Sequence, residues 1–150
     1  MKKHLVSGIV LIVALLVMVS LSFAQQTRNS WEPGSQYSRM YNPATVETIS
    51  GTVDVIQTFT LEQSKRPGIH MMVKTDKETV EVHLGPKWYL DNQDIIIQKG
   101  DKVDVTGSRV TYQEKPAIIA KEVKKGDSVL MLRNDSGIPL WAGWRKWKKQ

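Results

Sequence analysis

Between residues 46 and 133, the chain is a series of short segments in which β-branched and other apolar residues alternate with polar ones. A two-residue period of this kind is the pattern of strands that bury one face. Turn-forming residues separate the segments, as at 75–78 and 124–127. The pattern predicts an all-β domain in which only residues 85–92, opened by Pro86, are suited to a short helix.

The predicted strands cover 46–60, 69–75, 79–84, a stretch around 103–107, 117–123 and 129–133. Gly51, isolated inside the long first strand, is expected to mark a bulge or a sharp bend. Three strands, a short helix and two or more further strands form the order of an open barrel. We therefore expect a five- to six-stranded OB-like barrel over 45–133, with its helix between strands three and four.

Four short motifs strengthen this interpretation: Ser50-Gly51-Thr52-Val53, Val82-His83-Leu84-Gly85-Pro86, Gly100-Asp101-Lys102-Val103 and Val105-Thr106-Gly107-Ser108. Through them the chain resembles small exported bacterial OB-fold proteins, from Tyr41 to Trp141. The resemblance implies the barrel fold and a setting outside the cytoplasm. It implies no settled activity.

The N-terminus has the pattern of a secretory signal. Lys2 and Lys3 precede an apolar run from Ile9 to Val19, and the segment ends in Ser22-Phe23-Ala24. We expect cleavage after Ala24 and a periplasmic or secreted protein. The alternative is a retained membrane anchor, because about 20 apolar residues can span a bilayer.

The sequence contains no cysteine. A lipoprotein anchor, a disulfide, a thiolate metal site and covalent c-type haem attachment are therefore excluded. Residues 25–44 are polar, rich in turn formers and without periodicity, which predicts a flexible linker. Residues 134–150 form a basic tail with three of the five tryptophans.

The hairpin around Asp76-Lys77 predicts which side chains share a face. Its register places Ile69, Met71 and Val73 opposite Leu84, Val82 and Val80 on the apolar face. The other face then holds His70 opposite His83, Met72 opposite Glu81, and Lys74 opposite Thr79.

Directly opposed residues have Cβ atoms about 5 Å apart, so two imidazoles can share one ion. His70, His83, Glu81 and Met72 are thus candidate ligands for a divalent ion or copper. The competing interpretation is that both histidines decorate the solvated side of the sheet, because two ligands are only half a site.

This sheet face is also where OB-folds usually bind extended polymers. It offers Lys74 but no aromatic platform for stacking bases, which disfavours nucleic acid. Tyr112, expected in the loop between strands four and five, is a candidate contact residue. Trp88 and Tyr89 lie on the predicted helix, where one of them is expected to plug the barrel end, and we expect Trp88 to be the core residue.

The tail is the second candidate surface. Trp141 is expected to pack on the barrel, whereas Trp144, Arg145, Lys146 and Trp147 are candidate contacts for a protein partner, an envelope component, an anionic membrane or a polyanion. No nucleophile elbow, phosphate loop or zinc-protease helix occurs in the sequence. We therefore expect an exported, non-enzymatic binding module or, alternatively, an envelope-associated accessory protein.

Overall fold

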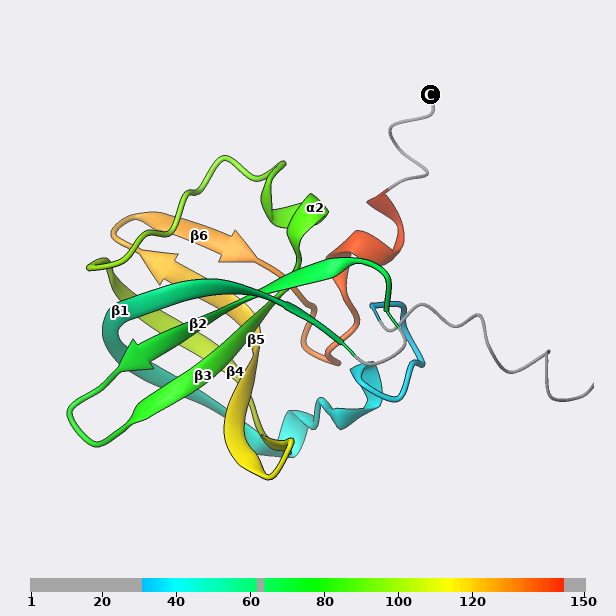
Figure 1. Cartoon of the computed structure of the whole chain (residues 1–150), viewed down its shortest axis with the longest axis horizontal. Helices are drawn as coiled ribbons and strands as arrows, with labels where there is room; N and C mark the ends of the chain where they lie inside the picture. Colours follow the sequence, from blue (N-terminus) through cyan, green and yellow to red (C-terminus); the bar gives the residue numbers. More distant parts are fainter. Residues whose placement is uncertain (1–30, 62–63, 145–150) are drawn as a thin grey trace, which may run out of the picture.

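The computed structural model describes residues 31–61 and 64–144 (Figure 1). Within these ranges, six strands form a single sheet with the order β3-β2-β1-β4-β5-β6. The strands are β1 (Val46–Thr60), β2 (Pro67–Lys74), β3 (Thr79–Pro86), β4 (Lys102–Tyr112), β5 (Lys115–Lys125) and β6 (Ser128–Met131). The short helices are α2 (Lys87–Leu90) and the 3-10 turns η1 (Ser38–Met40), η2 (Pro43–Thr45) and η3 (Leu140–Ala142).

The sheet closes into a ring because β3 also pairs with β5. This pairing is parallel and joins Glu81, Val82 and His83 to Ala117, Ile118 and Ile119. All other strand pairs are antiparallel. A nearly all-β, ring-closed sheet with a short helix between β3 and β4 confirms the predicted fold class.

The long first strand is shared by both halves of the ring. Residues 46–52 of β1 pair with β4, and residues 52–60 pair with β2. A Cβ atom at Gly51 would lie 2.5 Å from the carbonyl oxygen of Lys74, so only glycine permits this approach. The register shift itself falls between Val53 and Val55. Gly51 is therefore a point of close contact, and the predicted bulge lies just beyond it.

The β2–β3 hairpin has the predicted register from His70–His83 to Lys74–Thr79. The prediction is wrong at one pair, because a register shift between Ile69 and His70 places Ile69 opposite Gly85. The apolar face fills the barrel as expected. Together with side chains from the rest of the chain it forms the barrel core. The largest fully buried aliphatic side chains of this core are Val53, Met71, Val73, Val80, Val82, Val105, Ile118, Ile119, Val123 and Leu132.

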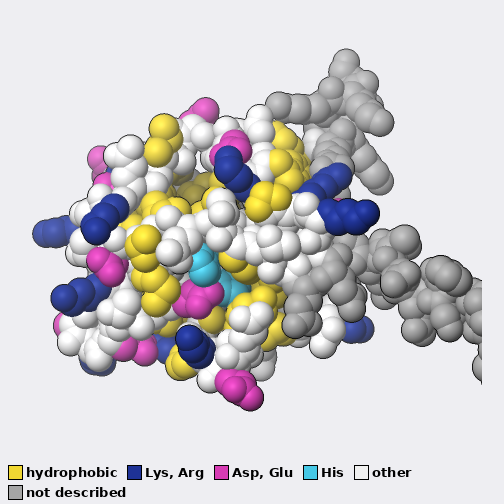
Figure 2. Space-filling view, in the orientation of Figure 1, with side chains coloured by type: hydrophobic (Ala, Val, Ile, Leu, Met, Phe, Trp, Pro, Cys, Tyr) yellow, Lys and Arg dark blue, Asp and Glu magenta, His cyan; other side chains and the backbone are white. Residues whose placement is uncertain are grey.

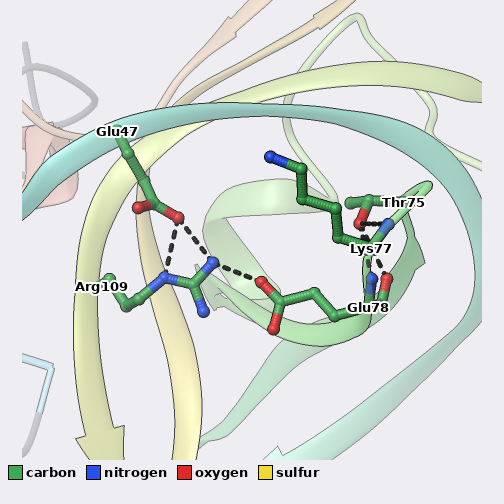
Figure 3. Close-up of polar contacts among 5 residues, drawn as sticks. All are labelled: Glu47, Thr75, Lys77, Glu78 and Arg109. Carbon is green, nitrogen blue, oxygen red and sulfur yellow. Dashed lines mark hydrogen bonds and ion pairs between the residues drawn. The ribbon is translucent and has the colours of Figure 1, made fainter.

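An ion-pair network ties the hairpin tip to the neighbouring strands (Figure 3). The guanidinium of Arg109 on β4 donates from Nε to Glu47 Oε1 at 2.8 Å and from Nη2 to Glu78 Oε1 at 2.5 Å. Thr75 closes the turn itself, because its Oγ1 accepts from the amide of Glu78. The two contacts of Arg109 join the hairpin tip to β1 and β4, and the Thr75 contact holds the turn together.

The prediction of a flexible linker over 25–44 is wrong where the structure describes it. Residues 31–45, called the N-terminal segment below, pack along one side of the barrel (Figure 1). Trp31, Tyr37 and Tyr41 are 2%, 7% and 7% exposed. Burial of three large aromatic side chains outweighs the polar composition on which the linker prediction was based. Residues 25–30 lie outside the described ranges.

The chain after β6 also belongs to the fold. Arg133 and Pro139 form an isolated bridge, and η3 carries Trp141, which is 3% exposed. The packing of Trp141 on the barrel was predicted and is confirmed. Of the two helix aromatics, Tyr89 is buried, whereas Trp88, expected in the core, is only half-buried against it. The described helices include none long and apolar enough to cross a membrane; the expected signal at residues 1–24 lies outside the described ranges.

Candidate metal centre

Two histidines and a glutamate meet on the face of β2 and β3 that points away from the barrel core. Nδ1 of His70 and Nε2 of His83 each lie 2.7 Å from the same oxygen, Oε1 of Glu81. One ligand atom from each residue lies within 4.8 Å of the other two. We call this group the His–Glu–His cluster.

Strand geometry explains why these three side chains converge. Side chains alternate between the two faces of a strand, so Glu81 and His83 share a face of β3. His70 is directly opposite His83 in the antiparallel pair. The structure therefore brings together three of the four predicted ligands, as the hairpin register required.

The cluster is not a decoration of a solvated sheet. The side chain of His83 has no exposed surface, while those of His70 and Glu81 are 16% and 22% exposed. Figure 2 shows histidine surface beside an acidic side chain on this face, framed by hydrophobic side chains. The site is thus closed on the side of His83 and open to solvent on the side of His70 and Glu81.

Three aromatic rings form the closed side. Tyr37 stacks on His83 at a centroid distance of 5.8 Å, and Tyr112 meets the edge of the same imidazole at 4.8 Å. The ring of Phe59 lies 4.9 Å from His83 and also stacks on His70 at 4.9 Å. An apolar shell of this kind limits water access and lowers the local dielectric constant, which strengthens the electrostatic interactions within the cluster.

Each imidazole also has a polar partner on its other nitrogen. The hydroxyl of Tyr37 lies 3.0 Å from Nδ1 of His83, and Oε1 of Gln57 lies 3.3 Å from Nε2 of His70. Metal-bound histidines nearly always hydrogen-bond through the nitrogen that does not bind the ion. Both histidines of the cluster therefore have the outer partner that metal coordination requires.

The ionisation of the cluster suits an ion as well. Burial acts to raise the pKa of Glu81, but the hydrogen bonds from His70 and His83 outweigh it and hold the pKa below its ordinary value. Burial lowers the pKa of His83, and the hydrogen bond to Glu81 opposes this only in part. At neutral pH the cluster therefore presents an anionic carboxylate and a neutral buried imidazole, which are the forms that bind metals.

A buried arginine, Arg133, binds the backbone of β3 and β5 next to the cluster. Nη1 of Arg133 donates to the carbonyl oxygens of Leu84, at 3.1 Å, and of Ala120. These residues follow His83 and Ile119, the last pair of the β3–β5 ladder. Arg133 thus fastens the ring closure next to His83, and its charge also helps to lower the pKa of that imidazole.

The remaining predicted contacts lie apart from the cluster or in a different setting. Met72 lies opposite Glu81 and is half-buried; its role as a fourth ligand stays a prediction. Lys74 is exposed at the end of β2, four residues and about 13 Å along the strand from His70. Lys74 is therefore separated from the cluster by most of the strand.

Tyr112 is the last residue of β4 rather than a loop residue, and its ring packs on His83. Trp144 is half-buried against Trp88 and Tyr89, with centroid distances of 5.7 Å to each. Both aromatics therefore have packing roles within the chain, and their contact with a partner stays a prediction. Arg145, Lys146 and Trp147 lie outside the described ranges.

Tyr37, Gln57 and Arg133 were not predicted as site residues. Tyr37 lies in the segment assigned to a linker. Gln57 faces His70 through the β1–β2 register, which the hairpin pattern alone does not define. Arg133 lies in an isolated bridge after β6. The spacing of aromatic residues at 31, 37 and 41 is the one sequence signal that could have placed the N-terminal segment on the barrel.

Two imidazole nitrogens and one carboxylate oxygen form a donor set typical of first-row divalent ions. Fold and cluster together define a small β-barrel protein with a candidate metal centre on one sheet face. The model of the MamS/MamX magnetosome protein family matches residues 45–130, more than half of the chain, and the chain belongs to this family. No curated protein is significantly similar to it. The matched region contains the whole His–Glu–His cluster, whereas Tyr37, Arg133 and Trp141 lie outside it.

Proposed function

We propose that the protein is an exported, non-enzymatic module that binds a divalent metal ion through His70, Glu81 and His83. One observation carries the proposal: two imidazole nitrogens converge at 2.7 Å on a single carboxylate oxygen. The ligand atoms come from two hydrogen-bonded strands of a closed barrel, so little ordering is needed when an ion enters. The 16–22% exposure of His70 and Glu81 gives the ion a path from solvent.

The donor set favours zinc or a neighbouring first-row divalent ion. Zinc, nickel, copper(II) and iron(II) all accept imidazole and carboxylate ligands, whereas calcium and magnesium prefer oxygen alone. Three protein ligands leave room for water or for a ligand from a partner. Met72, if it reaches the ion, would favour copper(I).

In this proposal the protein acts outside the cytoplasm as an accessory protein of the cell envelope. Membership in a family of magnetosome proteins supports an envelope-associated accessory role. The sequence pattern at residues 1–24 supports export. The absence of a nucleophile motif from the sequence supports a binding role rather than catalysis.

The decisive experiment is zinc titration of the full mature chain followed by NMR of the histidine side chains. Zinc should shift the imidazole signals of both His70 and His83, with one ion bound per chain. Glu81→Gln keeps the size and hydrogen-bonding capacity of the side chain but removes its charge, so it should weaken zinc binding at least tenfold. Glu114→Gln, an equal charge change on an exposed turn, is the matched control. Unchanged imidazole signals at excess zinc would remove the metal from the function.

An accessory role at a membrane makes a separate prediction for the basic tail. Trp141 is part of the core and Trp144 is half-buried against α2, so the cations beyond them are the residues to test for a membrane contact. Co-sedimentation with anionic vesicles should weaken when Lys146, Lys148 and Lys149 are replaced by glutamine in the full chain. Equal binding by both proteins would exclude the tail from an envelope contact.

A further inference from the structure

The hydrogen bond between His83 and Glu81 defines the tautomer of the buried imidazole. Oε1 of the ionised Glu81 can only accept, so the single proton of the neutral imidazole lies on Nε2, 2.7 Å from that oxygen. Nδ1 of His83 then has a free lone pair, and the hydroxyl of Tyr37, 3.0 Å away, donates to it. The three groups form a directed chain from Tyr37 to the carboxylate of Glu81.

Metal binding reverses this chain. An ion bound by Nε2 needs the lone pair of that nitrogen, so the imidazole proton must move to Nδ1. Nδ1–H then donates, and the hydroxyl oxygen of Tyr37 accepts with one of its lone pairs. Apart from the imidazole proton, only the hydroxyl hydrogen changes its position, because the 3.0 Å separation of the two heavy atoms suits both directions of the hydrogen bond.

The reversed bond is the stronger one. An imidazole whose other nitrogen binds a cation is a better hydrogen-bond donor than a neutral phenol, because the ion withdraws electron density from the ring. The bond joins β3 to the N-terminal segment. Its strengthening therefore favours the docked position of that segment.

The segment has other attachments that keep it docked without an ion. Nε1 of Trp31 donates to the carbonyl of Arg66, and the amide of Asn42 donates to Oγ of Ser108. The ring of Trp31 lies where a Cβ atom on Gly68 would be, only 2.2 Å away. Tyr37 is thus held near His83 from both sides, at residues 31 and 42.

We propose that Tyr37 is the positioning residue of the metal site, and that its hydrogen bond couples metal binding to the docking of the N-terminal segment. The inference rests on the proposed function, because it concerns the same site. By linkage, an ion that tightens the segment must itself bind more tightly when the segment is docked. The segment is therefore part of the binding site and not only its neighbour.

The test compares Tyr37→Phe with Tyr41→Phe in the full mature chain. Tyr41 lies in the same segment and is equally buried, but its hydroxyl has no hydrogen-bond partner among the described residues. Zinc affinity is measured by competition with a chromogenic chelator. We expect Tyr37→Phe to bind zinc about 10- to 100-fold more weakly than the wild type, and Tyr41→Phe to bind it equally well.

Two further measurements separate positioning from mere stability. The ¹⁵N shifts of His83 should report protonated Nε2 without zinc and protonated Nδ1 with zinc in the wild type. Hydrogen exchange of the amides of Arg39 and Met40, which are bonded within the segment, should slow on zinc addition in the wild type and not in Tyr37→Phe. The wild-type exchange experiment needs no variant to fold.

Equal zinc affinity of Tyr37→Phe and wild type, or segment exchange that zinc leaves unchanged, would overturn the coupling while leaving the metal site intact. A wild-type chain that binds no zinc would overturn the proposed function, and the inference with it. The two failures are therefore distinguishable in one set of titrations.

Discussion

Oε1 of Glu81 accepts a hydrogen bond from Nε2 of His83 at 2.7 Å, although the His83 side chain has no exposed surface. A buried histidine whose proton is shared with a carboxylate is sensitive to acid, to metal ions and to the elements that cover it.

The first prediction concerns pH. The pKa of His83 is held below its ordinary 6.5 and that of Glu81 below its ordinary 4.5. Since the unfolded chain binds these protons at higher pH than the folded chain, their contribution to stability is full above about pH 7. It is lost first for His83 as the pH falls below 6.5, and then for Glu81 below 4.5.

Urea unfolding in the presence of a chelator checks this. The free energy of unfolding should fall with decreasing pH by at most about 1.4 kcal/mol per unit for each proton taken up on unfolding. Glu81→Gln should have a shallower fall below pH 4.5. Stability that is constant between pH 7.5 and 5 would contradict the burial of a neutral His83.

The second prediction concerns zinc and stability. An ion that binds only the folded chain stabilises it by about 2.7 kcal/mol when free zinc is 100-fold above the Kd. Thermal or urea unfolding should therefore shift on zinc addition and return on addition of a chelator. Glu81→Gln should respond less at the same zinc concentration, while Glu114→Gln should respond like the wild type. A shift of equal size in all three proteins would place the ion elsewhere.

The third prediction concerns Arg133, which is 2% exposed and lies 4.8 Å from the centroid of the Trp141 ring. Arg133→Met removes a desolvated charge, which is favourable, but deprives the carbonyls of Leu84 and Ala120 of their donor. Two unsatisfied carbonyls cost about 1–3 kcal/mol each. The second effect should win, and we expect a net loss of about 2 kcal/mol in urea unfolding.

Lys121→Met is the control for that loss, because solvent screens the ion pair of Lys121 with the exposed Asp135 and the pair contributes little to stability. If Arg133→Met were as stable as the wild type, the ring closure at β3–β5 would not depend on the guanidinium.

The fourth prediction concerns the N-terminal segment. Trp31 contacts the rings of Tyr37, Phe59 and Trp141 at centroid distances of 5.4–6.3 Å. Trp31→Ala should therefore cost about 3–5 kcal/mol of unfolding free energy, the range for large aromatic side chains in cores. Gln36→Ala, on an exposed position of the same segment, should change stability by less than about 0.5 kcal/mol. A neutral Trp31→Ala would restore the linker interpretation.

Much of the site could be predicted from the hairpin alone. The turn at residues 75–78 and the spacing of the two histidines on either side of it are local features of the sequence. Because side chains alternate every two residues, only one register of the hairpin puts all the apolar residues on one face. That register brought His70, Glu81 and His83 together before any tertiary contact was considered. The same reasoning failed at Ile69, because the register shift there depends on how β2 meets the end of β3.

The cover over the cluster could not be predicted in this way. Tyr37 follows a polar, aperiodic stretch, and nothing in its neighbours indicates that it meets a residue 46 positions later. The partner of a buried aromatic residue depends on the shape of the closed barrel. The same reason hid Arg133, whose two carbonyl partners lie on β3 and β5.

Strand alternation and turn chemistry act over a few residues, so local patterns were enough to predict the succession of strands along the chain, the short helix and the face on which the two histidines and the glutamate lie. Long-range packing covers this face, buries His83 in its neutral form and places Tyr37 against Nδ1 of that imidazole. These properties come from the parallel β3–β5 closure and from aromatic burial of the N-terminal segment, which are contacts between distant parts of the chain.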